Sequence, residues 1–469
     1  MTRLPKPSKE GQATELGSLV PFISSPKSRD NRPTVTIVTQ GCKLNQADSD
    51  VLARRFAEAG YSIVDAADGP QIFVLNTCTV TGTADAKARR ALRSARRSNP
   101  ESLVVATGCY AQRAPLDLEG LEAVSMVIGN SQKDELVSII SSVSPAPVSI
   151  PELSAKPPRD NGLDTLQQNQ SKPPQSLRTR ANIKIQEGCD QICAYCIVPK
   201  VRGRERSIPV KELVEQINHL VRMGFKEVVL TGTQLGTYGF DLHDASLVKL
   251  LRQILSETTV PRIRVSSLQA QEISPELLDL WENPRLCPHF HIPLQSGSDP
   301  VLKAMRRRYD TQTFAAMIDI VRHRIPDAGI TTDIIVGFPG EDDSDFQESL
   351  RFSASMDFSD MHVFPYSPRP GTSAAHFINH VPDVAKKERA AEMLAVSNLG
   401  FKAFRDNQLG TTRPVLWEKV SKKDRAYLLS GLTDNYIRVY GQSHVNLTNV
   451  IVRTQLIEGK DGHPRAVMI

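Results

Sequence analysis

The chain has 469 residues, 40% of them hydrophobic, which is enough for two or three domains that each bury a core. Its formal net charge of +5 is mildly basic and permits a polyanionic partner without requiring one. No uncharged apolar run approaches the length needed to cross a bilayer, and the polar first segment lacks the apolar core of a secretion signal. We therefore expect a soluble cytoplasmic protein without a membrane partner.

The first third of the chain predicts a tail followed by an α/β domain. Residues 1–33 are polar, with scattered Pro, Ser and Lys, and predict a disordered tail. In residues 34–143 the apolar runs TVTIVTQ, QIFVLNT and SLVVATG alternate with helical stretches such as DSDVLARRFAEAGY. Strand, helix and strand at this spacing predict a doubly wound parallel sheet.

The rest of the chain predicts a linker and two further domains. Residues 144–180 are rich in Pro, Ser, Gln and Lys and predict a linker. Residues 181–407 hold at least six strand signals, from ANIKIQEGC to MHVFPYS, separated by amphipathic helices, and predict a full or partial TIM-like barrel with its active site at the strand carboxyl ends. Short β runs in residues 408–469 predict a small antiparallel β-barrel. That last segment has nine Lys or Arg against five Asp or Glu, so it carries +4 of the net charge.

Seven cysteines in a large chain without a secretion signal argue against a disulfide framework and favour metal ligation or redox chemistry. Six of them lie in motif-like settings. Cys287 stands alone in NPRLCPHF and is more typical of a small buried residue.

Cys189, Cys193 and Cys196 form the pattern C-x-x-x-C-x-x-C directly after the strand signal ANIKI and Gly188. One loop can therefore present three thiolates. Iron–sulfur clusters normally have four thiolate ligands, so three leave one iron free to bind another molecule. The alternative is a zinc site completed by a histidine, but no histidine lies nearby and zinc sites usually use C-x-x-C pairs. The pattern favours an iron–sulfur cluster with an open iron.

Cys42, Cys78 and Cys109 are far apart in sequence, but each follows a predicted parallel strand, in TIVTQGC, FVLNTC and VVATGC. The carboxyl ends of parallel strands meet at one edge of a sheet, where the ligands of open α/β sheets gather. We expect these cysteines to hold a second cluster. The alternative is three small buried residues at strand ends.

The loop GCDQICAYC, with Tyr195 before its third cysteine, resembles the radical S-adenosylmethionine (SAM) signature. Two three-cysteine sites in this order, followed by a small β-barrel, resemble the methylthiotransferase family of radical SAM enzymes over roughly residues 34–469. The resemblance also rests on GCKLNQADSD, NTCTVTGTADAKARR, TGCYAQ, LTGTQLGTYG, HIPLQSGSDPVLKAMRRRY, TDIIVGFPGE and HVFPYSPRPGT. The terminal runs VLWEK and GLTDNYIRV resemble the OB-like, RNA-binding TRAM domain.

This resemblance implies two [4Fe–4S] clusters and SAM as cofactors. The cluster on Cys189, Cys193 and Cys196 would be catalytic and activate SAM, and the other three cysteines would hold a cluster that handles or donates sulfur. The product would be a methylthio group at an unactivated carbon. An electron donor such as flavodoxin or ferredoxin and a sulfur source are then expected as partners.

The resemblance further implies transfer RNA as substrate. GCKLNQ and LGTYG resemble the branch that modifies C2 of N6-threonylcarbamoyladenosine beside the anticodon. Three alternatives stay open: isopentenyladenosine in transfer RNA, a ribosomal protein side chain, and an iron–sulfur RNA-binding protein without catalysis.

Residues expected to contact SAM lie in the cysteine loop or directly after predicted strands. In the family, the methionine end of SAM rests against backbone after the strand EVVL, and later strand ends could contact the ribose or adenine. Each of the later residues could equally build a turn. His289 and His291 alternate along one strand, so they face one side of it. The expected SAM contacts are Tyr195, Thr231, Gly232, Thr233, Gln295, Ser296 and Gly337.

The predicted helix AKARRALRSARRS carries five arginines within about a third of its circumference. No carboxylate offsets them in that stretch, whereas solvated faces usually mix signs. This favours RNA phosphate binding over a plain solvated face. The five are Arg89, Arg90, Arg93, Arg96 and Arg97.

Overall fold

The computed structural model describes residues 32–143, 179–423, 426–459 and 464–468. They form two compact units: residues 32–78 and 86–143 belong to the first, and residues 79–85 with those from 179 onward belong to the second. The predicted tail and linker lie almost entirely outside the described residues. In the part of the chain that is described, no helix is long and apolar enough to cross a bilayer.

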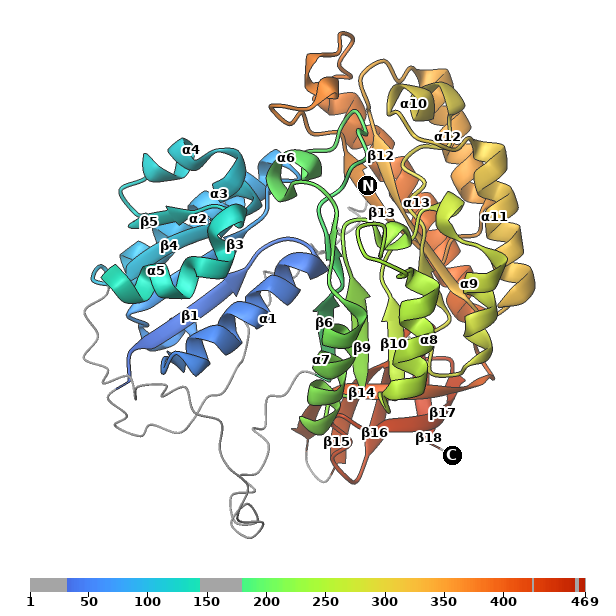
Figure 1. Ribbon diagram of the computed structural model, residues 1–469. Helices are drawn as coiled ribbons and strands as arrows, with labels where there is room; N and C mark the ends of the chain where they lie inside the picture. Colours follow the sequence, from blue (N-terminus) through green and yellow to red (C-terminus); the bar gives the residue numbers. More distant parts are fainter. Residues whose placement is uncertain (1–31, 144–178, 424–425, 460–463, 469) are drawn as a thin grey trace, which may run out of the picture. The chain divides into compact units, whose positions relative to one another are not determined.

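The first unit is built on a five-stranded parallel sheet with the strand order β2-β1-β3-β4-β5 (Figure 1). One core joins β1 to α1 and α5 on one face, and another joins β3 and β4 to α2 on the opposite face. The prediction of a doubly wound α/β domain is therefore confirmed. Its elements are β1 Thr34–Thr39, α1 Lys43–Glu58, β2 Ser62–Ile63, η1 Ala66–Asp68, β3 Ile72–Thr77, α2 Gly82–Ser98, β4 Leu103–Gly108, α3 Cys109–Arg113, α4 Pro115–Glu119, β5 Met126–Ile128, η2 Asn130–Glu135 and α5 Leu136–Val143.

The second unit contains six parallel strands that follow chain order in space. They form two three-stranded sheets, β10-β9-β6 and β11-β12-β13, linked by a bridge between Ile263 and Leu286 and by a 3.0 Å hydrogen bond from Leu268 N to His291 O. The predicted TIM-like barrel is thus present in its partial form. Its elements are β6 Arg180–Lys184, β7 Gln186–Glu187, α6 Val198–Arg202, β8 Arg206–Ser207, α7 Val210–Arg222, β9 Glu227–Thr231, η3 Leu235–Thr237, α8 Leu247–Glu257, β10 Arg262–Val265, η4 Ala270–Glu272, α9 Pro275–Asp279, η5 Leu280–Glu282, β11 His289–His291, α10 Asp299–Ala304, α11 Thr311–Arg324, β12 Gly329–Val336, α12 Asp343–Ser355, β13 Asp360–Pro365, η6 Ser373–His376 and α13 Asp383–Asp406.

The strands of this partial barrel are apolar on their outer face and polar on their inner face. Phe290, Ile334 and Met361 point outward into a large core shared with residues of α11 and α13. Because side chains alternate along a strand, their neighbours at odd or even positions must face the interior. We call that polar interior the lumen; its inner face carries Arg264, His289, His291, Asp333 and His362.

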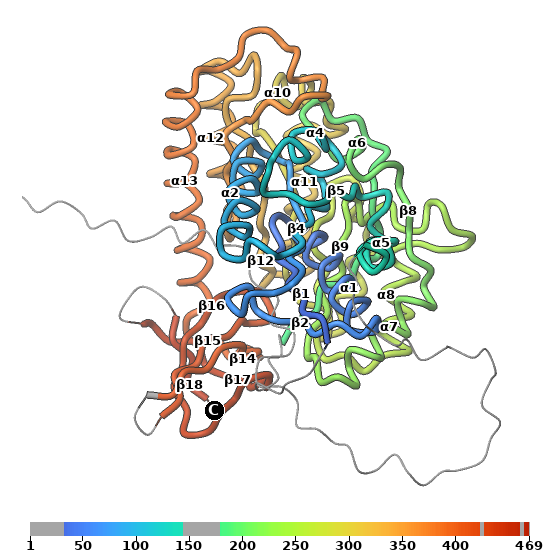
Figure 2. The backbone as a smooth tube through the Cα atoms, turned by 90° about the vertical axis from the view of Figure 1, so that its left-hand side faces the viewer, coloured from blue at the N-terminus to red at the C-terminus, as the bar shows by residue number. Residues whose placement is uncertain are grey.

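The C-terminal segment forms a closed five-stranded barrel that follows α13 (Figure 2). Four of its strand pairings are antiparallel, as predicted, whereas β16 and β18 pair in parallel and so close the barrel. Trp417 is fully buried at its centre, where Leu429, Val439 and Leu456 pack around it. Its strands are β14 Thr412–Lys423, β15 Ala426–Thr433, β16 Arg438–Ser443, β17 Ile451–Ile457 and β18 Arg465–Met468.

Candidate active site

The register of the first sheet brings Cys42, Cys78 and Cys109 to one edge. Thr39 pairs with Asn76 and Asn76 with Thr107, so β1, β3 and β4 end level with one another. Cys42 caps the start of α1, Cys78 follows β3, and Cys109 begins α3. Cys42 is exposed, whereas the other two are buried. The three cysteines therefore lie at one edge of the sheet, as the sequence predicts. Each stands just beyond the carboxyl end of its strand.

Asparagine side chains tie these strand ends together. Asn45 Nδ2 donates to Gln40 O at 2.7 Å and to Thr77 O at 3.0 Å, which links the loop before α1 to β3. Asn76 Nδ2 donates in turn to Asn45 O at 2.8 Å. Gly41 has φ +112°, and a Cβ there would lie 2.7 Å from Cys78 Cβ. Only glycine lets the backbone pass so close to the second cysteine.

The surroundings of this first cysteine edge fit an iron–sulfur cluster. Asn130 Nδ2 donates to Cys109 Sγ at 3.8 Å, the kind of N–H···S contact that tunes a cluster. The buried oxygens Thr39 Oγ1, Gln40 Oε1 and Thr107 Oγ1 find no hydrogen-bond partner among the described residues. A buried polar atom without a protein partner normally signals a missing ligand or water. Three thiols and unsatisfied oxygens at one sheet edge therefore suit a bound inorganic group.

The second cysteine site is a single loop after β6 and β7. Gly188 starts it with φ +78°, and a Cβ there would lie 1.8 Å from Arg204 O, so no larger residue fits. Cys189 N donates to Gly203 O at 3.1 Å and Cys196 N to Cys193 O at 3.1 Å, which fixes the curvature of the loop. Gln191 N also donates to Cys189 Sγ at 3.4 Å.

Charged and amide side chains surround that loop. Arg307 Nη1 donates to Cys193 Sγ at 3.4 Å, and its Nη2 donates to Gln269 Oε1 at 3.1 Å. Gln269 Nε2 reaches back to Gln191 Oε1 at 3.2 Å, so the amide closes a ring of contacts around the loop. Nearby, Gln234 donates to Glu272, and burial raises the pKa of Glu272 to about 7. The loop therefore lies in a polar pocket with a fixed positive charge and a carboxyl group that titrates near neutrality.

Burial raises the pKa of Cys189 to about 11 and that of Cys196 to about 12. Without a metal both side chains are therefore thiols at neutral pH. Ligation deprotonates them, because a thiolate is stabilised by the cationic iron that replaces its proton. Three partly buried thiols with N–H donors on two of their sulfurs fit an iron–sulfur cluster with one open iron.

The residues predicted to contact SAM stand around this loop, and their roles stay predictions. Thr231 ends β9, and Thr233 donates to Gly188 O, so the segment TGT lies against the cysteine loop. A Cβ at Gly232 would lie 2.9 Å from Gln186 O, which explains the glycine by close packing. Tyr195 lies among the apolar residues around Phe338.

The other three residues predicted to contact SAM lie in turns that follow strands β11 and β12. Gln295 has φ +71° and its N donates to Asp333 O at 2.8 Å, which joins its turn to β12. Ser296 is buried and accepts from Ser298 N at 3.3 Å. Gly337 has φ +71°, and a Cβ there would meet the side chain of Lys386, so its glycine is explained by packing against α13.

Tyr436 of the C-terminal barrel closes the bottom of the lumen. It stands in the turn between β15 and β16 with φ +72°, a strained conformation for an aromatic residue. Its hydroxyl donates to Glu227, the first residue of β9, and the Arg264 guanidinium lies 4.1 Å from its ring centroid. The His289 ring centroid is 4.7 Å away. The amino ends of the strands, opposite the cysteine loop, are therefore sealed by this side chain.

Two hydrogen bonds and an ion pair join the C-terminal barrel to the amino ends of the partial-barrel strands. Arg262, at the start of β10, donates to Leu432 O at 3.0 Å and Thr433 O at 2.7 Å. Arg180, at the start of β6, pairs with Glu418 at 2.5 Å. Breaking this partly buried pair would leave Arg180 and Glu418 without each other, which is unfavourable. The C-terminal barrel is thus fastened to the partial barrel.

The arginine face of α2 divides into two groups. Arg89 donates to Tyr110 OH at 2.7 Å, and Arg96 donates to Ser102 O at 2.8 Å and Ser125 Oγ at 2.6 Å. These two stabilise the first unit itself. The phosphate-binding prediction therefore depends mainly on the three exposed arginines, which are Arg90, Arg93 and Arg97.

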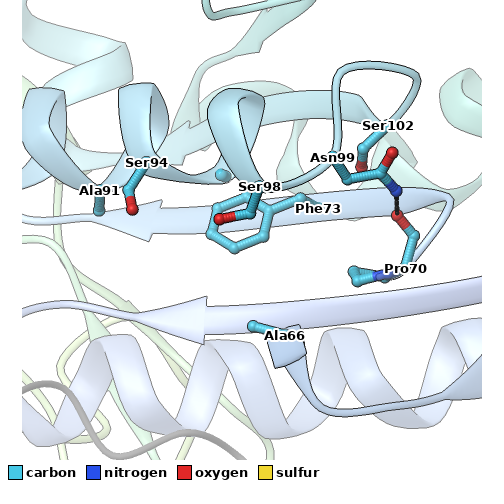
Figure 3. A pocket seen from close by; sticks show the side chains of 9 residues that line it. Ala66, Pro70, Phe73, Ala91, Ser94, Ser98, Asn99 and Ser102 are labelled. Carbon is cyan, nitrogen blue, oxygen red and sulfur yellow. Dashed lines mark hydrogen bonds between the residues drawn. The ribbon is translucent and has the colours of Figure 1, made fainter. Parts of the chain in front are cut away.

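A cavity of ≈ 240 Å³ lies beside α2, with Phe73, Ser94 and Ser98 in its wall (Figure 3). Pro70 and Ser102 also line it, and they precede β3 and β4. The cavity is therefore at the amino ends of the strands, away from the cysteine edge, and takes no part in that site.

Several side chains at the two sites were not singled out from the sequence. Arg307 lies in the run MRRRY, and three adjacent arginines do not reveal which one turns inward. Gln269 and Glu272 follow β10, and their position just after a predicted strand was the available signal. Cys287 is buried, as expected for a residue outside the cysteine sites.

Different protein families match the two units of the chain. Residues 183–353 match the radical SAM superfamily, and residues 34–129 match a family described as uncharacterized protein family UPF0004. Among solved structures, the radical S-adenosylmethionine methyltransferase TsrM from Kitasatospora setae has a TM-score of 0.51 at 15% identity and covers 73% of this chain and 77% of its own. At that identity the likeness shows the fold alone.

Curated relatives extend over nearly the whole chain. It is 35% identical to threonylcarbamoyladenosine tRNA methylthiotransferase MtaB of Bacillus subtilis (strain 168), over 92% of this chain and 95% of that protein. The protein of that name from Thermotoga maritima is 37% identical over 86% and 90%. The tRNA-2-methylthio-N(6)-dimethylallyladenosine synthase of Endomicrobium trichonymphae is 32% identical over 90% and 97%. With two cysteine sites in the predicted places and relatives of this length and identity, the chain belongs to the radical SAM methylthiotransferase family.

Proposed function

We propose that this protein is a transfer RNA methylthiotransferase that adds a methylthio group to C2 of N6-threonylcarbamoyladenosine beside the anticodon. The observation that carries the proposal is the pair of three-cysteine sites in one chain, one at a sheet edge and one on a loop at the mouth of a partial barrel. A methylthio group needs both sulfur and a means of activating a C–H bond that no side-chain base could deprotonate. Two separate metal sites provide for those two tasks.

Each cofactor would have its own set of side chains. Cys189, Cys193 and Cys196 would hold one [4Fe–4S] cluster with SAM on its open iron, and the first cysteine edge would hold the other. Bound there, these groups supply one-electron and sulfur chemistry that amino acids lack. Arg307 and Gln269 orient the loop, and Glu272 and Gln234 are placed to take polar groups of SAM.

The lumen would supply a chamber below the loop that is closed at one end. Tyr436 and the ion pairs around it seal the amino ends of the strands, so water is excluded from that side. A dry chamber strengthens every polar contact inside it and protects reactive species from solvent. The target base would enter from the side of the cysteine loop.

Transfer RNA binding is supported by the charge distribution. The C-terminal barrel segment carries +4, and Arg90, Arg93 and Arg97 are exposed on α2. Neutralising backbone phosphates is the main source of nonspecific affinity for nucleic acids. Binding should weaken with salt and with Arg93→Glu or Arg97→Glu, whereas Lys211→Glu, an exposed reversal on α7, serves as the matched control.

The choice of threonylcarbamoyladenosine is supported by relatives named for it, which are 32–37% identical, whereas the dimethylallyladenosine synthase is 32% identical. We propose further that the protein works in the cytoplasm with an electron donor such as flavodoxin or ferredoxin and an external sulfur source.

The test is mass spectrometry of nucleosides from transfer RNA that has been incubated with reconstituted enzyme, SAM, reductant and sulfide. Transfer RNA carrying threonylcarbamoyladenosine should be converted to its methylthio form. Isopentenyladenosine transfer RNA should be converted far more slowly, and a ribosomal protein should not be modified. Conversion of the isopentenyl substrate alone would refute the choice of nucleoside but not the reaction.

A further inference from the structure

His291, Asp333 and His362 form a polar cluster on the inner face of three neighbouring strands. Asp333 and His362 are direct partners in the pairing of β12 with β13. His291 Nε2 lies 3.2 Å from Asp333 Oδ2, and His362 Nδ1 lies 3.1 Å from Asp333 Oδ1. The carboxylate thus faces one imidazole with each oxygen. His291 Nδ1 is 2.9 Å from Thr331 Oγ1, which fixes the orientation of its ring.

The cluster lies close to the cysteine loop. Leu268 N donates to His291 O, and the next residue, Gln269, contacts both Gln191 and Arg307 at the loop. Arg307 Nε also donates to Tyr309 OH at 3.0 Å. Burial is the main cause that raises the pKa of Tyr309 to about 12, and the charge of Asp333 contributes to the rise. The cluster therefore lies further into the lumen, below Gln269 and Arg307, which contact the cysteine loop.

An exposed aromatic ring stands between the cluster and the mouth of the lumen. Phe364 lies two residues beyond His362 on β13, so both face the same side of the strand. Its partner across the sheet is Ile335, two residues beyond Asp333. Phe364 keeps 42% of its surface exposed, although it is a large apolar residue of a barrel strand. An exposed ring of this kind is a stacking platform for a nucleobase.

The positions of C2 and N6 on adenine fit the order in which the cysteine loop, Phe364 and the polar cluster follow one another along the lumen. C2 and C6 flank N1 in the ring, so their outward bonds diverge. A base that stacks on Phe364 with C2 toward the cysteine loop would direct its N6 substituent deeper, toward His362 and Asp333. A threonylcarbamoyl group carries N–H donors for the Asp333 carboxylate as well as hydroxyl and carboxylate acceptors for His362. An isopentenyl group would displace water from the Asp333 carboxylate and the His362 imidazole but could not hydrogen-bond to either side chain, which is unfavourable.

We propose that Phe364 holds the target base and that His291, Asp333 and His362 form the subsite for its polar N6 substituent. This inference rests on the proposed function and deepens it by naming the side chains that select the nucleoside. Sites built to hydrogen-bond a substrate group reject analogues that lack it far more strongly than apolar pockets reject an added group. His362 is the selecting residue, because it is half exposed at the top of the cluster.

The experiment compares wild type, His362→Ala, His362→Asn and Phe364→Ala with transfer RNAs that carry threonylcarbamoyladenosine or isopentenyladenosine. His362→Ala should lower kcat/KM for the threonylcarbamoyl substrate by about 100-fold, mainly through KM, and leave the isopentenyl rate unchanged or higher. His362→Asn keeps a donor near the Nδ1 position and should recover part of the loss. Phe364→Ala should weaken both substrates by about 10-fold or more, because stacking acts on the base itself.

Controls separate selection from damage. His323→Ala, an exposed change on α11, should leave both rates unchanged. SAM cleavage without transfer RNA and the EPR signal of the SAM-bound cluster should be the same in all variants, since none of them touches the cysteine loop. If His362→Ala keeps these signals and its preference between the two transfer RNAs is unchanged, the subsite is refuted. If wild type converts neither transfer RNA, the proposed function itself fails, and this inference fails with it.

Discussion

The two cysteine sites obtain three ligands in opposite ways. Cys42, Cys78 and Cys109 come from the ends of three strands, so their spacing depends on the register of a whole sheet. Cys189, Cys193 and Cys196 come from one loop whose curvature is fixed by its own backbone hydrogen bonds. The first site is therefore as stable as its fold, while the second needs only a local turn.

Their surroundings differ as well. Amides dominate around the first cysteine edge, with a buried ion pair beneath it in which Lys133 Nζ lies 3.1 Å from Asp48 Oδ2. Arginine, glutamine and a carboxyl group of raised pKa surround the second. Under the proposed function, the first site would only hold and pass sulfur, whereas polar groups of both signs at the second would suit the amino and carboxylate groups of SAM.

The largest expected effect comes from removing the second site. The triple change of Cys189, Cys193 and Cys196 to Ala should abolish deoxyadenosine formation, a loss of about 1000-fold or more, and halve the iron content of about eight per chain. The loop is local, so the fold should persist. The measurements are iron analysis and chromatography of SAM cleavage products, and surviving SAM cleavage would contradict the assignment.

Removal of the first site should separate the two tasks. Cys42→Ala, Cys78→Ala or Cys109→Ala should eliminate methylthio product while SAM cleavage stays within about 10-fold of wild type, because the second loop keeps all its ligands. Both products can be quantified in one reaction by mass spectrometry. Normal methylthio product from these variants would reduce the three residues to structural cysteines.

A smaller effect tests the dependence of the first site on sheet geometry. Gly41→Ala adds a methyl group 2.7 Å from Cys78 Cβ at φ +112° and should destabilise the first unit by about 1–3 kcal/mol and lower iron loading there. Gly69→Ala is the matched control, since it also has positive φ but no atom within 4 Å of the added carbon. Equal iron content and thermal stability in the two variants would show that the close approach does not matter.

The smallest effect concerns the carboxyl group beside the second loop. Folding raises the pKa of Glu272 from 4.5 to about 7, chiefly by burial. Such a group stabilises the folded state below its unfolded pKa, and this contribution is lost as pH rises through the folded value. Glu272→Gln should therefore raise the free energy of unfolding of metal-free protein by about 2 kcal/mol at pH 8 and leave it nearly unchanged at pH 4, as measured by denaturant titration. Exposed Glu282→Gln should change neither value; a pH-independent gain for Glu272→Gln would argue against ionisation.

Sequence patterns predicted the strands, the helices and the positions of the cysteines, because these depend on residues close together in the chain. Strand periodicity and the position of each cysteine after a strand were enough to predict where both sets of three cysteines lie, and their role as cluster ligands stays a prediction. The polar lumen was only partly visible, because His291 alternates along a recognisable strand while His362 stands in a run that reads as apolar. Tyr436 could not be predicted at all, since its role depends on how the turn of one barrel meets the strand ends of another.

That turn links two parts of the protein that would otherwise be interchangeable modules. The C-terminal barrel resembles an RNA-binding domain, yet its Tyr436 also closes one end of the lumen, where it contacts Glu227 and Arg264. A truncation meant to remove only RNA affinity would also open the lumen to solvent. It would leave Arg180 without Glu418, and the Arg262–Glu227 ion pair would lose its contacts with Leu432, Thr433 and Tyr436. Chimeras with the terminal barrel of another enzyme should keep their chemistry only when this tyrosine and its ionic neighbours are transplanted together.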